Sequence, residues 1–92
     1  MIASFAHKGL EKFFRTGSVA GIQANHAKKL RAILLRLNQM SVIEDVNFPG
    51  LHLHPLRGDL KGFWSLRVSG NWRVIFKFDG EDVSRVDYVD YH

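Results

Sequence analysis

Two short segments contain side chains that can move protons or bind a phosphate. The first, LHPLRGD at residues 53–59, places His54 and Arg57 at a predicted turn. The second is the end of the printed sequence, Asp90, Tyr91 and His92. Histidine titrates near neutral pH, so it can act as a general base or a general acid. With nearby arginines, these residue types are the ones that RNA cleavage without a metal ion requires.

That reaction needs three kinds of group around one phosphate. A base takes the proton from the ribose 2′-OH, which attacks the adjacent phosphorus, and an acid protonates the departing 5′-oxygen. Cations stabilise the charge that develops on the phosphorane. The two segments together offer imidazoles, a phenol and an arginine for these tasks.

The same residue types also have simpler explanations. His52 and His54 are both consistent with ordinary surface histidines, and as a pair on one face they are also consistent with half of a metal site. The absence of cysteine and of a neighbouring acid disfavours the metal site. Trp64, Trp72 and Tyr88 are predicted to be core residues and not platforms for stacked bases, because they have the parity of the buried face.

The first half of the chain has the periodicity of helices. A short strand is expected at residues 2–5, followed by a helix over residues 7–16 that Gly17 ends. Asn25 is expected to cap a second helix that runs to about Met40 with its apolar residues on one stripe.

The second half changes to the two-residue alternation of β-strands. Alternating apolar residues predict strands at 51–54, 64–68, 72–78 and 83–89, with hairpin turns at 69–71 and 79–82. The order is one strand, two helices and a four-stranded antiparallel meander. This order predicts a single α+β domain over residues 1–92, with the helices on one sheet face.

The alternation also assigns side chains to the two faces of the sheet. Apolar positions face the helices, and the opposite face, called the outer face below, is predicted to be uncovered and rich in cations. The strand residues predicted on the outer face are His52, His54, Ser65, Arg67, Arg73 and Lys77. In the last strand, Asp87, Val89 and Tyr91 are expected on this face as well. The alternation leaves the directions of Asp90 and His92 open.

Composition limits the class of protein. The chain is 46% hydrophobic and has no cysteine, which excludes disulfides, thiol catalysis and cysteine-bound zinc and is typical of a reducing cytoplasm. No signal peptide and no stretch able to cross a bilayer is recognisable, so we expect a cytoplasmic protein with no membrane partner. No cofactor and no metal ion is expected.

Charge is unevenly distributed along the chain. The formal net charge is +4, and residues 1–40 contain seven Lys and Arg against one Glu. Basic small domains often meet nucleic acid or an acidic protein. Lys28, Lys29 and Arg31 therefore form either a solvated helix face or a weak contact with RNA, and Lys77 is a further weak candidate.

At these residues the sequence resembles the HigB branch of the RelE-like toxins of bacterial type II toxin–antitoxin systems. The resemblance rests on IASFAHKGL at residues 2–10, LHPLRGD at 53–59, GFWSLRV at 62–68, NWRVIF at 71–76 and the final DYH at 90–92. It extends over essentially the whole chain, and the helical region 18–50 matches least. The combination of LHPLRGD, NWR and DYH is specific, whereas each piece alone would be weak.

The resemblance implies the RelE-like fold and a ribosome-dependent endoribonuclease that cuts messenger RNA in the decoding site. It also implies a HigA-like antitoxin with a helix-turn-helix, and a complex of both proteins that binds its own promoter DNA. The basic residues of the helix would then contact RNA or the ribosome.

The resemblance assigns cleavage to the two segments described first. We predict that His54 and His92 divide the base and acid roles, in an order that stays open. Tyr91 is expected to stack on or position the nucleotide, and Asp90 to orient a neighbouring imidazole or tyrosine. Arg57 stands where several relatives carry lysine.

Arginine stays protonated at ordinary pH, so Arg57 is expected to bind the phosphate and not to transfer a proton. Arg73 and Arg67 are expected to share this task.

Two other functions remain open. ParE-like relatives share this architecture but act on DNA gyrase without cutting RNA, and primer extension on a translated message separates the two. A non-enzymatic module that binds nucleic acid or an antitoxin through its basic face would bind RNA in a salt-sensitive way and cleave nothing.

Overall fold

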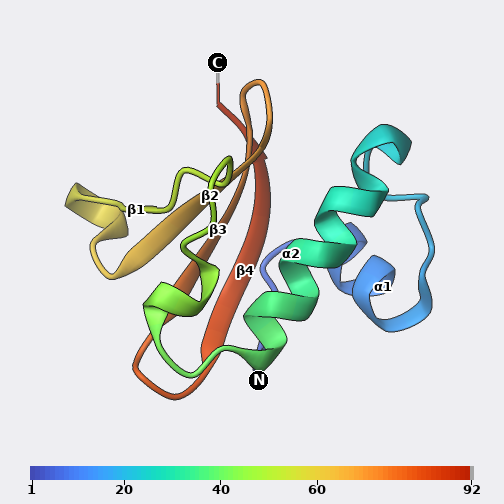
Figure 1. Ribbon diagram of the computed structural model, residues 1–92. Coiled ribbons are helices and arrows are strands. Elements are labelled where there is room, and N and C mark those ends of the chain that lie inside the picture. Colours follow the sequence, from blue (N-terminus) through green and yellow to red (C-terminus); the bar gives the residue numbers. More distant parts are fainter. Residues whose placement is uncertain (92) are drawn as a thin grey trace.

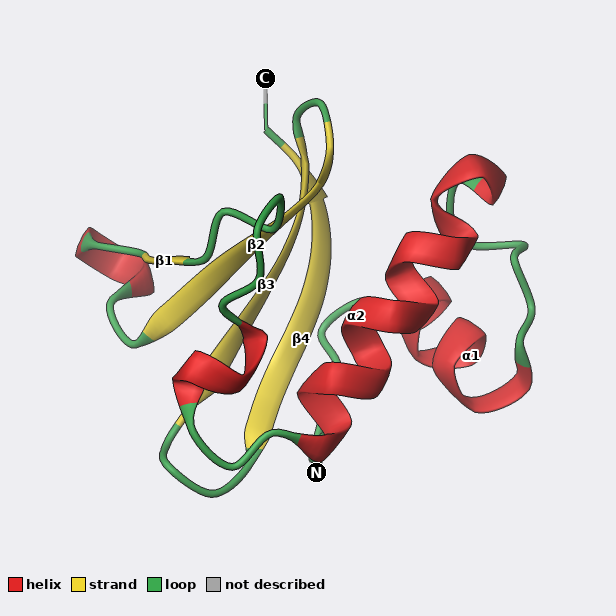
Figure 2. Cartoon of the chain, in the orientation of Figure 1, coloured by secondary structure: helices red, strands yellow, loops and turns green. Residues whose placement is uncertain are grey.

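The protein has two layers, a four-stranded sheet and two helices that lie on one side of it (Figure 1; Figure 2). The computed structural model describes residues 1–91. The helices are α1 (Lys8–Thr16) and α2 (Ala27–Gln39), and the strands are β1 (His54–Pro55), β2 (Phe63–Ser69), β3 (Trp72–Phe78) and β4 (Val83–Asp90). Short 3-10 helices occur at Ala24–His26, Ile43–Val46 and Gly58–Leu60. The predicted α+β fold with helices on one sheet face is confirmed.

The sheet is the predicted meander, with strand order β1-β2-β3-β4 and antiparallel pairing throughout. One row of paired residues crosses the whole sheet and consists of His54, Ser65, Ile75 and Asp87. The next row pairs Arg67 with Arg73 and Arg73 with Val89. Because paired residues point to the same side of a sheet, these two rows form the outer face.

Helix α1 begins and ends as its sequence predicts. The Nδ1 atom of His7 accepts a hydrogen bond from the backbone N–H of Leu10 at 2.9 Å and caps the first turn. Gly17 ends the helix in the left-handed conformation, with φ of 82°, and donates its N–H to the carbonyl of Phe13.

Helix α2 begins later than predicted. Asn25 lies inside the 3-10 helix Ala24–His26 and does not cap α2, which starts at Ala27 without a side-chain cap. The chain is held there by a contact between His26 and Tyr88, two residues that are far apart in the sequence. The predicted cap was wrong because this tertiary contact, and not a local hydrogen bond, sets where the helix begins.

Two predicted strands are shorter in the structure. Residues 2–5 form no strand, only isolated parallel bridges of Ile2 and Phe5 to β4. The strand predicted at 51–54 is reduced to His54–Pro55, because His52 adopts a left-handed φ of 49° that no regular strand contains. Proline also lacks the N–H that would extend the ladder.

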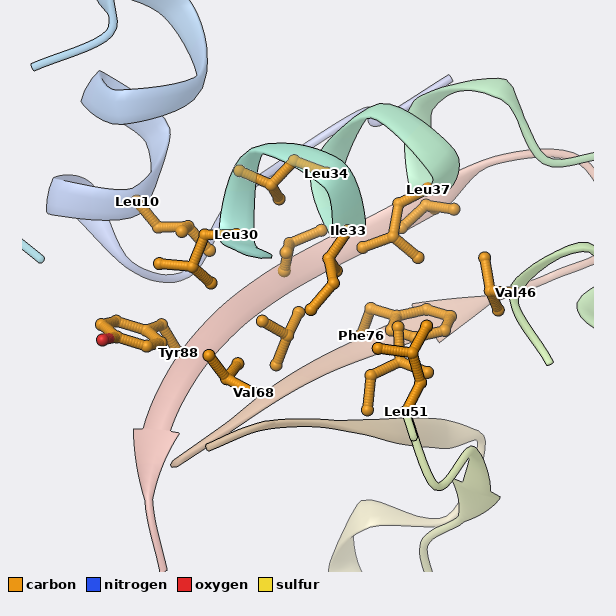
Figure 3. Packing of buried hydrophobic residues seen from close by; sticks show 14 of the residues in the cluster. Leu10, Leu30, Ile33, Leu34, Leu37, Val46, Leu51, Val68, Phe76 and Tyr88 are labelled. Carbon is orange, nitrogen blue, oxygen red and sulfur yellow. The ribbon is translucent and has the colours of Figure 1, made fainter. Parts of the chain in front are cut away.

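The core lies between α2 and the inner face of the sheet (Figure 3). Leu30, Ile33 and Leu37 lie on the side of α2 that faces the sheet, where Phe76 is fully buried, whereas Leu34 is buried on the side toward α1. Burying one such side chain contributes about 1.5–3 kcal/mol, so this stripe fixes the helix on the sheet. Within residues 1–91, no helix is long and apolar enough to span a membrane.

Candidate functional site

The outer face contains the predicted cations, but it is not uncovered along its whole length. His54 and Lys77 are exposed and Arg67 and Arg73 are half-buried. In contrast, Ser65 and Ile75 are buried at the centre of this face. The prediction of an uncovered surface was wrong for Ser65, which lies between His54 and Ile75 in the ladder. Ile75, which the register also places on this face, was not among the residues predicted there.

His54 is held in a form suited to accept a proton. Its Nδ1 atom lies 3.1 Å from the backbone carbonyl of His52. A carbonyl oxygen can only accept a hydrogen bond, so Nδ1 must carry the hydrogen and the neutral ring has its lone pair on Nε2. The exposed ring can therefore take a proton from a bound substrate through Nε2.

Arg67 and Arg73 lie directly opposite each other on β2 and β3. Like charges opposite each other destabilise a sheet. Among the described residues the ion pairs are Met1–Asp82 and Glu11–Arg15, so neither arginine is neutralised by a carboxylate. Two arginines paired across the ladder without a carboxylate partner form an arrangement that a phosphate would stabilise.

The turn between β2 and β3 orders both Arg73 and the end of β4. The Nη1 atom of Arg73 donates to the carbonyls of Gly70, at 2.7 Å, and Trp72, at 3.1 Å. The backbone N–H of Tyr91 donates to the carbonyl of Asn71 at 2.8 Å. The Tyr91 ring, which is exposed, lies 6.0 Å from the Arg73 guanidinium carbon. Arg73 and Tyr91 are thus brought together.

Asp90 lies on the opposite side of this strand end. It pairs across the ladder with Trp72, whose indole belongs to the inner face and stacks on Tyr88 at 4.5 Å. The sequence left the direction of the Asp90 side chain open; the structure places it toward the inner face and away from His54. The tyrosine beside Asp90 on that face is Tyr88 rather than Tyr91. His92, predicted as a catalytic residue, lies outside the described residues.

Arg57 lies at the start of a short hollow beside β1. This hollow has a volume of about 380 Å³ and is lined by residues 55–58 and 61–64, which include Lys61. Lys77 lies next to this hollow. Its Cε is 3.8 Å from the position that a Cβ would occupy on Gly62, one of the lining residues. Lys61 was not predicted from the sequence as a site residue. Its short spacing from Arg57, across the Gly58–Leu60 turn, could have indicated that the two cations lie close together.

The predicted site residues are therefore spread over the sheet. Strands β1 and β4 are separated by two strands, so their backbones are about 14 Å apart at the usual strand spacing. His54 lies on β1 and Tyr91 directly follows β4, so the two would have to contact different parts of a substrate. Lys28, Lys29 and Arg31 do not join them, because α2 covers the other face of the sheet.

A second cluster, which the sequence did not reveal, lies beneath α1 and α2 on the inner face. The phenol oxygen of Tyr88 lies 2.6 Å from Nδ1 of the buried His26. His7 contacts the edge of the Tyr88 ring, and Trp72 contacts both Tyr88 and His26. His26 and Tyr88 are 62 positions apart in the sequence, so no local sequence pattern could have paired them.

Burial raises the pKa of the Tyr88 phenol above its ordinary value. A backbone hydrogen bond from Gln23 opposes this rise, and the nearby charge of Asp90 adds to it. The buried hydrogen bond between His26 and Tyr88 fixes the loop before α2 to the end of β4.

The described residues offer no metal centre. Within residues 1–91, no three side chains of His, Asp or Glu are close enough together to hold a metal ion. His52 and His54 share a segment, but the carbonyl of His52 already binds the ring of His54.

The fold defines the class of protein. It is similar to the YoeB/ParE toxin from Agrobacterium tumefaciens, with a TM-score of 0.54, 23% identity, and 90% of this chain and 85% of that chain covered. It is also similar to YafQ from E. coli strain BL21(DE3), with a TM-score of 0.58, 18% identity, and coverage of 98% and 93%. The chain thus has the fold of the RelE-like toxins.

The sequence narrows this class to one family. Residues 3–92 match the family described as RelE-like toxin of type II toxin-antitoxin system HigB. The protein named Endoribonuclease HigB from Proteus vulgaris is 38% identical over 92 residues, which is 100% of both chains. The chain therefore belongs to the HigB family of RelE-like toxins, and the resemblance noted in the sequence is confirmed. Membership of a type II toxin–antitoxin family implies an antitoxin partner.

Proposed function

We propose that this toxin is a ribosome-dependent endoribonuclease that cleaves messenger RNA in the decoding site and thereby inhibits translation. The observation that carries the proposal is the hydrogen bond from His54 Nδ1 to the His52 carbonyl, which leaves Nε2 as a base on an exposed surface. The name of the relative from Proteus vulgaris, Endoribonuclease HigB, supports the same activity.

The outer face supplies the other groups that this reaction needs. His54 takes the proton of the 2′-OH, and Arg67 and Arg73 bind the scissile phosphate between them. Arg57 and Lys61 bind a neighbouring phosphate at the hollow beside β1. Tyr91, exposed beside Arg73, stacks on a base. His92 is then the acid that protonates the 5′-oxygen, and the chemistry uses no metal ion.

The spread of these groups favours a substrate held by a larger body. Because His54 lies on β1 and Tyr91 directly follows β4, with two strands between them, the RNA must be extended across the sheet with its backbone held in place. The ribosome provides a message in that form. A helix-turn-helix antitoxin of the HigA type would neutralise the toxin, and the complex would bind promoter DNA.

The test is to induce this gene alone and then with its neighbouring gene, while mapping the 5′ ends of messages by primer extension. New 5′ ends within codons, absent when the antitoxin gene is present, would support the proposal. Growth arrest with unchanged messages and inhibited supercoiling would indicate a ParE-like gyrase inhibitor instead. Salt-sensitive RNA binding without cleavage on added ribosomes would indicate a non-enzymatic module.

A further inference from the structure

One buried polar atom on the outer face lacks a partner. Ser65 has 0% of its surface exposed, and among the described residues its Oγ is the buried side-chain oxygen or nitrogen without a hydrogen bond. Leaving a buried hydroxyl unsatisfied costs about 1–3 kcal/mol. An alanine at this position would avoid that cost, so a role for the hydroxyl has to be sought in its surroundings.

Ser65 lies directly across the ladder from His54. Both side chains point to the outer face, and directly paired residues have their Cβ atoms about 4.5–5.5 Å apart. On its other side Ser65 pairs with the apolar Ile75, which offers no hydrogen bond. The polar side chain that the ladder places beside this hydroxyl is therefore the imidazole of His54.

The present orientation of His54 depends on an unusual backbone. Its Nδ1 donates to the carbonyl of His52, a non-glycine residue in the left-handed region at φ of 49°. Only a few per cent of non-glycine residues adopt a positive φ, and histidine is one of the types enriched among them. His54 thus has two acceptors within reach of one side-chain rotation, the His52 carbonyl that it uses and the Ser65 hydroxyl that is unsatisfied.

We propose that Ser65 is a positioning residue for His54, with its hydroxyl accepting the Nδ1–H of the imidazole when RNA is bound. This inference rests on the proposed function and extends it to the orientation of the base. In either orientation Nδ1 carries the hydrogen and Nε2 has the lone pair, so the proton chemistry is the same. In the second orientation the ring lies over β2, toward the Arg67–Arg73 pair, and the buried hydroxyl is satisfied.

The experiment compares Ser65→Ala, Ser65→Thr, His54→Ala and the double variant His54→Ala/Ser65→Ala with the wild type. Cleavage of a translated message is followed with ribosomes in excess, and melting temperature is measured for each protein. Ser65→Ala is expected to lower kcat about 10- to 100-fold, the range known for residues that orient a functional histidine. Its KM should stay unchanged. Its melting temperature should not fall, because the substitution removes an unsatisfied buried hydroxyl.

The double-mutant cycle of His54 and Ser65 then separates an effect of Ser65 on the position of His54 from an effect on packing. If Ser65 acts through His54, Ser65→Ala has no further effect in the His54→Ala background, and Ser65→Thr, which keeps the hydroxyl, restores kcat. Undiminished cleavage by Ser65→Ala, or a loss that follows its melting temperature, would overturn the inference. A wild-type protein that cleaves nothing would instead remove the proposed function, so the two failures are distinguishable.

Discussion

His54 and His26 lie on opposite sides of the same sheet, and their surroundings differ in each respect that matters for proton transfer. His54 is exposed, and its Nδ1 binds a backbone carbonyl of its own segment. His26 is buried in the helix layer, and its Nδ1 binds the phenol of Tyr88. One histidine keeps a nitrogen available to solvent and substrate, while the other is enclosed by Trp72 and Tyr88.

The arginines divide in the same way. Arg31 and Arg36 on α2 lie over the rings of Phe13 and Phe48, at 5.4 Å and 3.7 Å, and so cover apolar surface. Arg67 and Arg73 on the outer face oppose each other without a carboxylate, within the described part of the chain. Residue type alone does not separate these two pairs of arginines; the layer of the fold in which they lie does.

The largest effect is expected from His54→Ala. Removing a general base should lower cleavage about 10²–10⁴-fold, while an exposed substitution changes the free energy of unfolding by no more than about 0.5 kcal/mol. Primer extension and thermal unfolding measure the two quantities. His52→Asn is the matched control, because asparagine tolerates the left-handed backbone and keeps the carbonyl. Its cleavage should be close to wild type; a loss as large as that of His54→Ala would remove the distinction between these neighbours.

The opposite pattern is expected from His26→Ala. Loss of its packing and of the Tyr88 hydrogen bond should lower the free energy of unfolding by about 2–4 kcal/mol. Chemical denaturation measures this loss, and cleavage per folded molecule should remain within a few-fold of wild type. If the folded variant were as inactive as His54→Ala, the inner cluster would have to be part of the catalytic site.

A smaller effect is expected from Tyr88→Phe, which leaves Nδ1 of His26 without its partner and should cost about 1–3 kcal/mol. The pKa of Tyr88 is raised by burial, so its contribution to stability is complete below about pH 10, the ordinary tyrosine value, and is lost as pH rises through the higher folded pKa. The wild type should therefore lose stability above pH 10 more steeply than Tyr88→Phe. Tyr91→Phe, at an exposed position, is the control for loss of a tyrosine hydroxyl and should keep the wild-type free energy of unfolding at neutral pH.

The smallest effect on stability is expected from Arg67→Gln. Relieving the like-charge pair should raise the free energy of unfolding by about 0.2–1 kcal/mol. The same change should weaken RNA binding and reduce the slope of log K against log salt by about 0.7, the value for one contact to a single strand. Arg31→Gln on the helix layer should leave this slope unchanged. An equal change in both variants would mean that RNA also contacts α2.

Much of the fold was predictable because two periodicities are strong here. Alternation over residues 64–68 and 72–78 identified the meander and the correct faces for Arg67 and Arg73. Gly17 ends α1 because glycine adopts a positive φ without steric cost. The placement of three candidate site residues was predictable to the same extent, since strand parity put His54, Arg73 and Tyr91 on one face.

Other features could not be predicted from local sequence. The direction of Asp90 depends on its register with Trp72, and a strand end has no following residues to fix its phase. The late start of α2 depends on the contact of His26 with Tyr88, and Asn25 looked like a cap because helix caps are recognised by residue type. The burial of Ser65 depends on neighbours from the two adjacent strands, β1 and β3.

The amino-acid sequence by itself determined the composition of the outer face, because side chains alternate along every strand whatever the partner strand is. It also determined family membership, through motifs that extend over the chain. The tertiary structure decided which of these groups have partners. In the structure His54 binds the carbonyl of His52 and pairs with the unsatisfied Ser65 across the ladder. Arg67 pairs with Arg73, and Asp90 lies on the same face as Tyr88. Those pairings depend on the register between strands and on contacts across the core, and a single strand contains neither.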